Sequence, residues 1–406
     1  MSLIQPFRAL RPAPGRAAEV LAPPYDVLSS AEARERAKSK PWSFLHVSKA
    51  EIDLPPATDP YDRAVYDKAA ENLRRMIEAG VLVRDEKPCF YVYRMIWRGH
   101  VETGFAAVAS LAAYASNRIR KHEHTTPAKE DDRVRQIEAV NAQTGPVMLA
   151  YPTAPNINAL VAEAAAGHAD IDVTADDGVR HQLWVVADDG KIAMLSRAVE
   201  ALPALYIADG HHRSAAAARV AQSRRYGDGY FLAVLFPQEE MTILDYNRVL
   251  RDLNGRTPQA LLEELRRGCA VEGSAEPVRP RSAAEVGMYL AGAWYRLSFS
   301  AAAVKADTAD PISRLPITLL TRNVIEPLFA ITDPRTDQRI DFVGGGRGLE
   351  ELARRVSSGE MAVAFALYPT QMHDLMAVAD AGAIMPPKST WFEPKLADGM
   401  VGYVLD

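Results

Sequence analysis

The sequence predicts an α/β or α+β fold with mixed sheets, made of several parts. Apolar runs of strand length and stretches with helical spacing of apolar residues are intermixed along the chain, which is the pattern of that class. A length of 406 residues is enough for two or three domains with cores of their own. Hydrophobic residues make up 48% and charged residues 24%, an ordinary balance for a globular protein. The order of strands in the sheets does not follow from the sequence.

Residues 1–85 are predicted to form an N-terminal region. Prolines fix an extended segment at 23–27, because their rings lock the backbone. A helix is expected at 30–38. A longer helix is expected at 62–79, where apolar residues recur at helical spacing and Gly80 ends the pattern.

Residues 86–256 are predicted to form a central region in which strands and helices alternate. Its expected elements are a hairpin of strands 90–97 and 101–109 around a turn, a helix at 129–142, a strand at 147–151, a helix at 157–166, strands at 183–186 and 202–208, a helix at 214–221 and a strand at 230–236. The last strand is almost wholly apolar, so we expect it to be buried on both faces. Residues 257–406 are expected to form a C-terminal α/β region.

The most informative segment is the run Asp209-Gly210-His211-His212-Arg213, which lies between an apolar strand and an alanine-rich helix. Gly210 permits a sharp turn, and a helix that starts there presents unpaired backbone N–H groups and the positive end of its dipole. Such a helix start attracts anions. Arg213 can hold a phosphate through two parallel hydrogen bonds, and the imidazoles can donate to phosphate oxygens or accept a proton.

Asp209 has two possible roles at this turn. It can bind Mg²⁺, which prefers oxygen ligands and bridges carboxylates to phosphates. Alternatively, it caps the helix while the histidines bind local backbone groups. A cap accounts for Asp209 but not for the residues after Gly210, so we expect a functional site. Asp209 and His211 are the expected catalytic residues, and Gly210, His212 and Arg213 are the expected phosphate- or nucleotide-binding residues.

A second polar cluster surrounds Glu123. This glutamate lies between His122 and His124 and is a candidate catalytic base, whereas the alternative is a solvated charged loop. Both histidines are possible additional site residues. Arg133 is expected to support phosphate binding, although the acidic residues before it also fit a plain helix start.

A third candidate is the run Lys388-Ser389-Thr390, with Lys395 shortly after it. A lysine beside hydroxyls is suited to phosphate binding, but the glycines of a phosphate loop are absent. A structural turn is the alternative. The glycine-rich run at 344–348 lacks the spacing of a dinucleotide-binding fingerprint, and we expect no ligand there.

Composition excludes several function classes. A net charge of −5 argues against a broad nucleic-acid surface. The longest apolar runs are too short to cross a bilayer, and the N-terminus is not expected to be a secretory signal. Two cysteines, Cys89 and Cys269, are too few for a disulfide or metal framework, so a cytoplasmic location is expected. The oligomeric state does not follow from the sequence.

Five motifs of the chain occur, in the same order, in a bacterial and archaeal family known as domain-of-unknown-function family 1015. The chain resembles this family over essentially its full length, and the family name implies no activity. The motifs are Pro23-Pro24-Tyr25-Asp26, His122-Glu123-His124-Thr125, Asp131-Asp132-Arg133, Asp209-Gly210-His211-His212-Arg213 and Met385-Pro386-Pro387-Lys388-Ser389-Thr390.

The central third is more distantly similar to ParB-like and sulfiredoxin-like proteins, and among them to the free-serine kinases. The resemblance implies a ParB-like central region in which 209–213 binds nucleotide phosphates. It also implies Mg²⁺ and ATP or ADP as cofactors, a catalytic role for Asp209 and a glutamate as base, for which Glu123 is the looser match. The long N- and C-terminal additions leave the substrate open.

These patterns predict an enzyme that transfers a phosphoryl group to a small hydroxyl compound such as serine. One alternative is a metal-dependent phosphohydrolase, in which Glu123 activates water and His122, His124, His211 and His212 bind a transition metal. Another is a non-catalytic nucleotide- or nucleic-acid-binding module, with nucleic acid the least expected partner because the chain is acidic. A small-molecule substrate and no membrane partner are expected.

Overall fold

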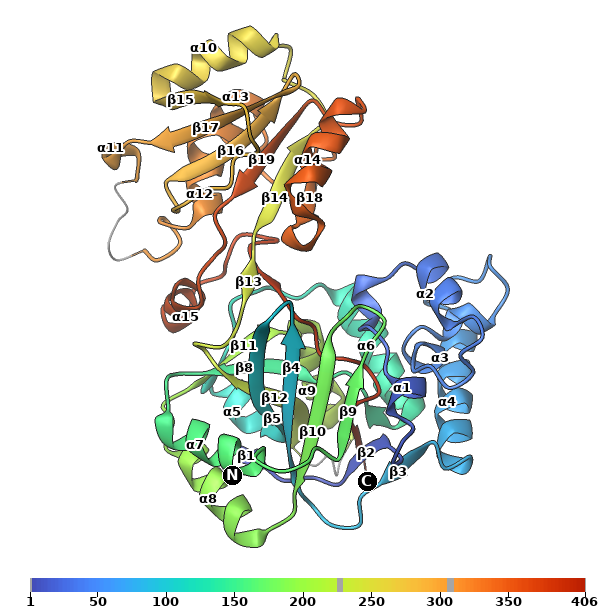
Figure 1. Cartoon of the computed structure of the whole chain (residues 1–406). Helices are drawn as coiled ribbons and strands as arrows, with labels where there is room; N and C mark the ends of the chain where they lie inside the picture. Colours follow the sequence, from blue (N-terminus) through green and yellow to red (C-terminus); the bar gives the residue numbers. More distant parts are fainter. Residues whose placement is uncertain (1, 225–228, 305–309, 406) are drawn as a thin grey trace. The chain divides into compact units, whose positions relative to one another are not determined.

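The computed structural model describes residues 2–224, 229–304 and 310–405 (Figure 1). The chain divides into two compact units, which we call unit 1 (Met1–Met241 with Pro394–Asp406) and unit 2 (Thr242–Glu393). Both units combine helices with sheets, and unit 1 has a mixed sheet, so the predicted fold class is confirmed. The three regions predicted from the sequence, 1–85, 86–256 and 257–406, stay a prediction of domain organisation.

Unit 1 is built on one large mixed sheet. Two of its strand pairs, β6 with β11 and β8 with β12, are parallel, and the others are antiparallel. Its strands, in spatial order, are β6 (Ile119–Arg120), β11 (Leu205–Asp209), β8 (Val147–Tyr151), β12 (Tyr230–Pro237), β5 (His100–Ser110), β4 (Phe90–Trp97), β10 (Arg180–Val186) and β9 (Ile171–Thr174), with β1 (Ile4–Gln5) beside β5. All residues of β12 are buried, which confirms the prediction for this strand.

A smaller sheet joins both ends of the chain within unit 1. Its strands, in spatial order, are β3 (Leu82–Arg84), β2 (Ala9–Pro12), β21 (Gly402–Val404) and β7 (Ala142–Gln143). Because β21 pairs with β2 and β7, residues 394–405 belong to unit 1 although unit 2 precedes them in the sequence.

The helices of unit 1 start at recognisable signals. Ser29 and Glu32 form a capping box at the start of α2, and Asp62 caps α4. Pro127 opens α6, and the left-handed Asn141 ends it. The helices are α1 (Ala17–Val20), η1 (Tyr25–Val27), α2 (Ser30–Ala37), α3 (Leu45–Ser48), η2 (Ala50–Asp53), α4 (Arg63–Glu78), α5 (Leu111–Ala115), α6 (Pro127–Val140), α7 (Pro155–Ala164), α8 (Asp189–Glu200) and α9 (His211–Ser223).

Helix α9, which carries the central motif, packs against α6 and against strands β8 and β12. Ala216 and Val220 of α9 contact Ile137 of α6 in a small apolar cluster. Arg219 of α9 also pairs with Glu130 and Asp131 at the start of α6. The apolar contacts hold α9 against α6, and the ion pairs of the exposed Arg219 add little to them.

Unit 2 is an antiparallel sheet with helices. Its strands, in spatial order, are β15 (Cys269–Ser274), β17 (Ala293–Phe299), β16 (Glu285–Leu290), β19 (Val363–Leu367), β14 (Tyr246–Leu250) and β18 (Ile340–Gly344), and β13 (Ile243–Leu244) pairs separately with β20 (Trp391–Phe392). Its helices are α10 (Pro258–Gly268), α11 (Ala301–Val304), α12 (Pro316–Leu320), η3 (Thr321–Ile325), α13 (Glu326–Phe329), η4 (Gly345–Arg347), α14 (Gly348–Ser357) and α15 (Met372–Asp380). Across the described residues of both units, no helix is long and apolar enough to cross a membrane.

Candidate functional site

Two parallel strands bring two of the predicted motifs to one edge of the main sheet. β6 and β11 run in parallel, with Ile119 opposite Leu205. The carboxyl ends of parallel strands lie at the same edge, which is where ligands bind in open α/β sheets. The loop after β6 contains 122–124 and the turn after β11 contains 209–211, so these segments meet.

The predicted order of strand, turn and helix at the central motif is confirmed. β11 ends at Asp209, Gly210 has a left-handed φ of 103°, and α9 begins at His211. A Cβ on residue 210 would lie 3.1 Å from Cζ of Arg213, so glycine is needed for space as well as for the turn. Gly210 is the N-cap and no side chain caps α9, so Asp209 is not the helix cap of the alternative interpretation.

Asp209 is shared by two cations. Its Oδ2 accepts a hydrogen bond of 3.3 Å from Nη2 of Arg213 and another of 3.3 Å from Nζ of Lys395. Burial by itself would raise the pKa of this carboxyl, but the charges of Lys395 and Arg213 outweigh burial and hold the pKa well below its ordinary value. One ionised carboxylate therefore faces two cations, and the carboxyl groups of Asp26 and Asp398 also act on Arg213.

The guanidinium of Arg213 is held in place from its other side by the backbone. Nη1 donates to the carbonyl oxygen of Pro146. A Cβ on Gly145 would lie 3.3 Å from Cδ of Arg213, so the small residue lets the chain approach the arginine closely. The side chain is 12% exposed. Arg213 is thus preorganised next to Asp209 with limited access to solvent.

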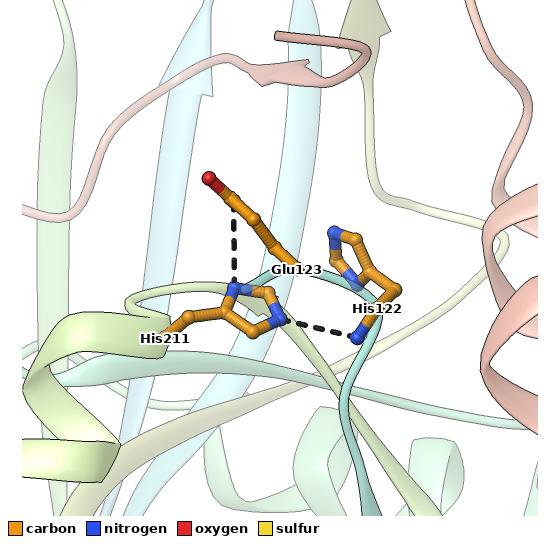
Figure 2. A group of neighbouring side chains, drawn as sticks. All are labelled: His122, Glu123 and His211. Atoms are coloured by element: carbon orange, nitrogen blue, oxygen red, sulfur yellow. Dashed lines mark hydrogen bonds and ion pairs between the residues drawn. The ribbon is translucent and has the colours of Figure 1, made fainter. Parts of the chain in front are cut away.

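Figure 2 shows Glu123 and the backbone nitrogen of His122 on different sides of the His211 ring. Nε2 of His211 accepts a hydrogen bond of 3.4 Å from the backbone N–H of His122, and Nδ1 lies 3.8 Å from Oε2 of Glu123. Because Nε2 is an acceptor, the ring hydrogen is assigned to Nδ1, on the side of Glu123. Burial, reinforced by the neighbouring His122, lowers the pKa of His211 well below its ordinary value. His211 is therefore a neutral donor directed at a carboxylate that is 46% exposed.

The ring of His122 is buried beside that of His211. The residue is 1% exposed; neither ring nitrogen makes a hydrogen bond of good geometry among the described residues, but the backbone of Ile207 lies close enough to favour the protonated ring. Its ring packs edge-on against that of His211, with the centroids 4.4 Å apart. Burial lowers the pKa of His122 to about 4, so the ring is neutral at physiological pH and its lone pair is available.

His122, Glu123 and His211 form a group that could hold a metal ion. One ligand atom from each residue lies within 4.8 Å of the others. Imidazole nitrogens and carboxylate oxygens are ligands of zinc, manganese and iron. The neutral ring of His122 fits this donor set, because one of its nitrogens carries a lone pair that can bind a metal ion.

The other two histidines of the predicted clusters lie outside this group. Nε2 of His212 accepts a hydrogen bond of 3.1 Å from the backbone N–H of Thr126, the N-cap residue of α6. His212 is partly buried and His124 is exposed. The roles predicted for His212 in phosphate binding and for His124 as an additional site residue stay predictions.

Residues of three predicted motifs, Tyr25, Arg133 and Arg213, line one cavity. The guanidinium of Arg133 lies 3.8 Å from the ring centroid of Tyr25 and forms an ion pair of 2.6 Å with Asp132. Arg133, Tyr25 and Arg213 line a cavity of about 30 Å³ together with the buried Asp398. The cavity therefore brings residues of three of the sequence motifs to one place beside Arg213. Burial raises the pKa of Asp398 to about 7.

The third predicted segment, Lys388-Ser389-Thr390, belongs to unit 2. Lys388 has a left-handed φ of 56° and lies 5.8 Å from the ring of Tyr246. Oγ of Ser389 donates to the carbonyl oxygen of Pro386 at 2.5 Å. These contacts belong to a local turn, and the predicted phosphate-binding role of the three residues stays a prediction.

The sequence gives little sign of two residues that complete the corner. The sequence places Lys395 with 388–390 as a possible source of a cation, whereas in the structure it binds Asp209. Asp398 has no sequence signal of its own, although it lines the cavity beside Arg213. Both positions follow from the pairing of β21 within unit 1, which a single sequence does not reveal.

Solved structures with a similar arrangement of elements share little sequence with this chain. A free serine kinase in complex with AMP is 12% identical, with a TM-score of 0.36 over 71% of this chain and 86% of that one. SbnI from Staphylococcus aureus, with a C-terminal truncation, is 10% identical, with a TM-score of 0.38 over 73% and 86%. A conserved hypothetical protein from Pyrococcus furiosus is 13% identical, with a TM-score of 0.35 over 72% and 93%.

A comparison with curated proteins gives no match. A family model, in contrast, matches residues 4–318, which is most of the chain and includes four of the five sequence motifs. The chain therefore belongs to the family described as "Protein of unknown function (DUF1015)".

Proposed function

We propose that unit 1 binds a phosphate-bearing ligand, such as ATP or ADP, at the start of α9 and transfers a phosphoryl group to a small hydroxyl compound. The observation that carries the proposal is the shared carboxylate of Asp209, to which both Arg213 and Lys395 donate at the start of an uncapped helix. Arg213 and Lys395 place two cationic donors beside this helix start, and charge-assisted hydrogen bonds from such donors suit a phosphate.

The start of α9 adds to this attraction. Its first backbone N–H groups have no side-chain cap, and the helix dipole places partial positive charge at the same point. A phosphate there would receive hydrogen bonds from the backbone as well as from a cationic side chain. Arg213 is suited to the clamp because its position is already fixed by Pro146 and Asp209.

Glu123 is the proposed catalytic base. Its carboxylate is exposed enough to reach a substrate, and the neutral His211 directs its Nδ1 hydrogen towards it. In this proposal His211 positions Glu123, since burial keeps the ring neutral and unsuited to donate a full proton. Glu123 would accept the proton of the attacking hydroxyl group.

Mg²⁺ is the proposed cofactor of this transfer. It would neutralise charge on the phosphates, and Asp209 is the carboxylate placed to share in binding it. Lys395 and Arg213 would then donate less to Asp209 and would donate to the phosphate oxygens instead. Serine is the proposed acceptor of first choice, following the resemblance of 209–213 to the free-serine kinases.

A metal-dependent phosphohydrolase is a second candidate, and the His122 ring favours it. That ring is buried and neutral, and one of its nitrogens lies within 4.8 Å of ligand atoms of Glu123 and His211. The three residues would hold a transition metal, and such a metal supplies an activated water at neutral pH. Elemental analysis separates the candidates, because stoichiometric zinc, manganese or iron supports the hydrolase and its absence supports the Mg²⁺-nucleotide enzyme.

The test is calorimetry of the full-length protein with ADP and ATP, with and without Mg²⁺, followed by detection of phosphoserine after addition of serine. Glu123→Gln should lower kcat by about 10²–10⁴-fold while nucleotide affinity stays near that of the wild type. Arg219→Gln, on the exposed part of the same helix, is the matched control and should change neither. Absence of any nucleotide binding would exclude the kinase proposal.

A further inference from the structure

Unit 2 contains a cavity of about 270 Å³, and none of its lining residues takes part in the proposed function. Its wall is mainly apolar. The lining residues are Arg248, Ile312, Ile317, Thr318, Thr321, Arg322, Ile325, Glu326, Ile331, Pro334, Ile340, Pro386 and Pro387. Small-molecule sites have this character, a largely apolar concavity with a few polar groups, and the volume suits a small ligand.

The most important polar residue of the cavity wall is Arg248, in the middle of β14. The residue is 1% exposed, so the guanidinium is removed from water. Nη1 donates to the carbonyl oxygen of Tyr246 at 2.7 Å, and Nη2 donates to those of Pro387 and Lys388 at 3.1 Å and 2.9 Å. These carbonyl oxygens satisfy hydrogen bonds but carry no net charge.

No carboxylate among the described residues forms an ion pair with Arg248, and the ring of Phe342, 4.7 Å from Cζ, is also neutral. Burial lowers the pKa of Arg248 to about 9, which still leaves it a cation at neutral pH. A buried charge without a counter-ion is costly, and an apolar side chain at the same position would avoid that cost. An anion in the cavity would compensate the charge.

Two further features point to a ligand. Thr318 lines the cavity, and its Oγ1 is buried without a hydrogen-bonding partner. The wall also includes the π-helical turn η3 (Thr321–Ile325), and such turns occur frequently at functional sites. Arg322 and Glu326, which are exposed, mark the side of the cavity that faces solvent.

We propose that this cavity binds a small amphiphilic anion, with an apolar body against the isoleucines and a single carboxylate near Arg248 and Thr318. The apolar wall supplies the hydrophobic contribution and the low local dielectric strengthens the attraction between opposite charges. The requirement for one negative charge distinguishes this ligand from the nucleotide proposed for unit 1.

Calorimetry of the full-length protein with octanoate, octan-1-ol and octylamine tests the proposal. These probes share one apolar chain and differ in head-group charge. Octanoate should bind, and octylamine should bind about tenfold or more weakly, because it brings a second cation beside Arg248. Arg248→Met should weaken octanoate binding by about tenfold or more and change octan-1-ol binding by less than about twofold.

Two other variants keep the test decisive if Arg248→Met does not fold. Ile325→Phe should fill the cavity and abolish binding of octanoate and octan-1-ol alike. Thr318→Val removes the unpartnered hydroxyl group at nearly constant volume and should weaken octanoate selectively. The proposal is wrong if octylamine binds as tightly as octanoate, if Ile325→Phe leaves octanoate binding unchanged, or if none of the probes binds.

Discussion

Arg213 in unit 1 and Arg248 in unit 2 are both held by the backbone but differ in charge compensation. Arg213 donates to the carbonyl oxygen of Pro146 and to the carboxylate of Asp209. Arg248 donates only to backbone carbonyl oxygens in the contacts described above. One guanidinium therefore has a counter-ion and the other has none.

The pKa directions express the same difference. Burial lowers the pKa of both groups, but for Arg213 the negative charge of Asp209 outweighs burial and the pKa is raised. For Arg248 burial is unopposed by a carboxylate, and the pKa falls to about 9. Burial alone thus does not identify a binding site. The informative quantity is the charge that remains after the partners within the protein are counted.

The largest effect is expected for Arg213→Met, which removes one partner of an ion pair whose side chains are 12% and 30% exposed. Asp209 would keep only Lys395, and the free energy of unfolding of unit 1 should fall by about 3 kcal/mol. Urea unfolding followed by circular dichroism measures the loss. Arg219→Met is the matched control, because Arg219 lies on the same helix with its side chain 43% exposed and pairs at the surface.

The control should cost less than about 1 kcal/mol, since exposed ion pairs contribute little. An equal loss for the two variants would show that the pair between Arg213 and Asp209 is no stronger than a surface contact.

The second prediction concerns the loss of stability at acidic pH, which should differ between the two units. In unit 1, the hydroxyl group of Tyr93 accepts from the backbone N–H of Ala397 and forms a hydrogen bond of 2.8 Å with Nδ1 of the buried His181. Burial lowers the pKa of His181 from 6.5 to about 4. Because the unfolded chain takes up the proton first, stability is complete above pH 6.5 and is lost as the pH falls towards 4, by roughly 3 kcal/mol.

Unit 2 has His373 as its single histidine, and that side chain is 73% exposed. Urea unfolding between pH 7 and 4 should therefore show a histidine-dependent loss in unit 1 alone. His181→Gln should be less stable at neutral pH but should lose less on acidification. An unchanged pH slope in this variant would contradict the assignment.

A smaller effect is expected for Gly210→Ala. The left-handed φ of 103° and the 3.1 Å approach of a Cβ to Cζ of Arg213 together should cost about 2 kcal/mol. Gly80→Ala is the control, because Gly80 also has a positive φ of 66° but no atom within 4 Å of a Cβ. The control should cost about 1 kcal/mol, from backbone strain alone. Equal losses would mean that Arg213 moves aside freely.

Local patterns were enough to predict much of unit 1. The strand predicted at 147–151 is β8, and the helix predicted at 62–79 is α4 with one residue fewer at each end. The helix α8 (Asp189–Glu200) was not predicted. Apolar spacing and caps act over a few residues, so a single sequence contains them.

The candidate site is harder because it depends on pairings between distant segments. The sequence identifies Glu123 and His211 as polar candidates, but only the parallel pairing of β6 with β11 shows why they meet. Lys395 reaches Asp209 across 186 positions of sequence. Arg248 has no sequence signal, since an arginine in a strand is usually exposed and its lack of a counter-ion is visible only in three dimensions.

The smallest effect on stability is expected for Arg248→Met, and it sharpens the contrast with Arg213 most directly. The variant loses hydrogen bonds to the carbonyl oxygens of Pro387 and Lys388 but also removes an uncompensated buried charge. The two effects oppose each other, so the free energy of unfolding of unit 2 should change by only about 1 kcal/mol or less. Arg251→Met, on an exposed residue that follows the same strand, is the control. A loss as large as that of Arg213→Met would mean that the carbonyl oxygens stabilise Arg248 as fully as Asp209 stabilises Arg213, and the case for an anion in the unit 2 cavity would then lose its electrostatic basis.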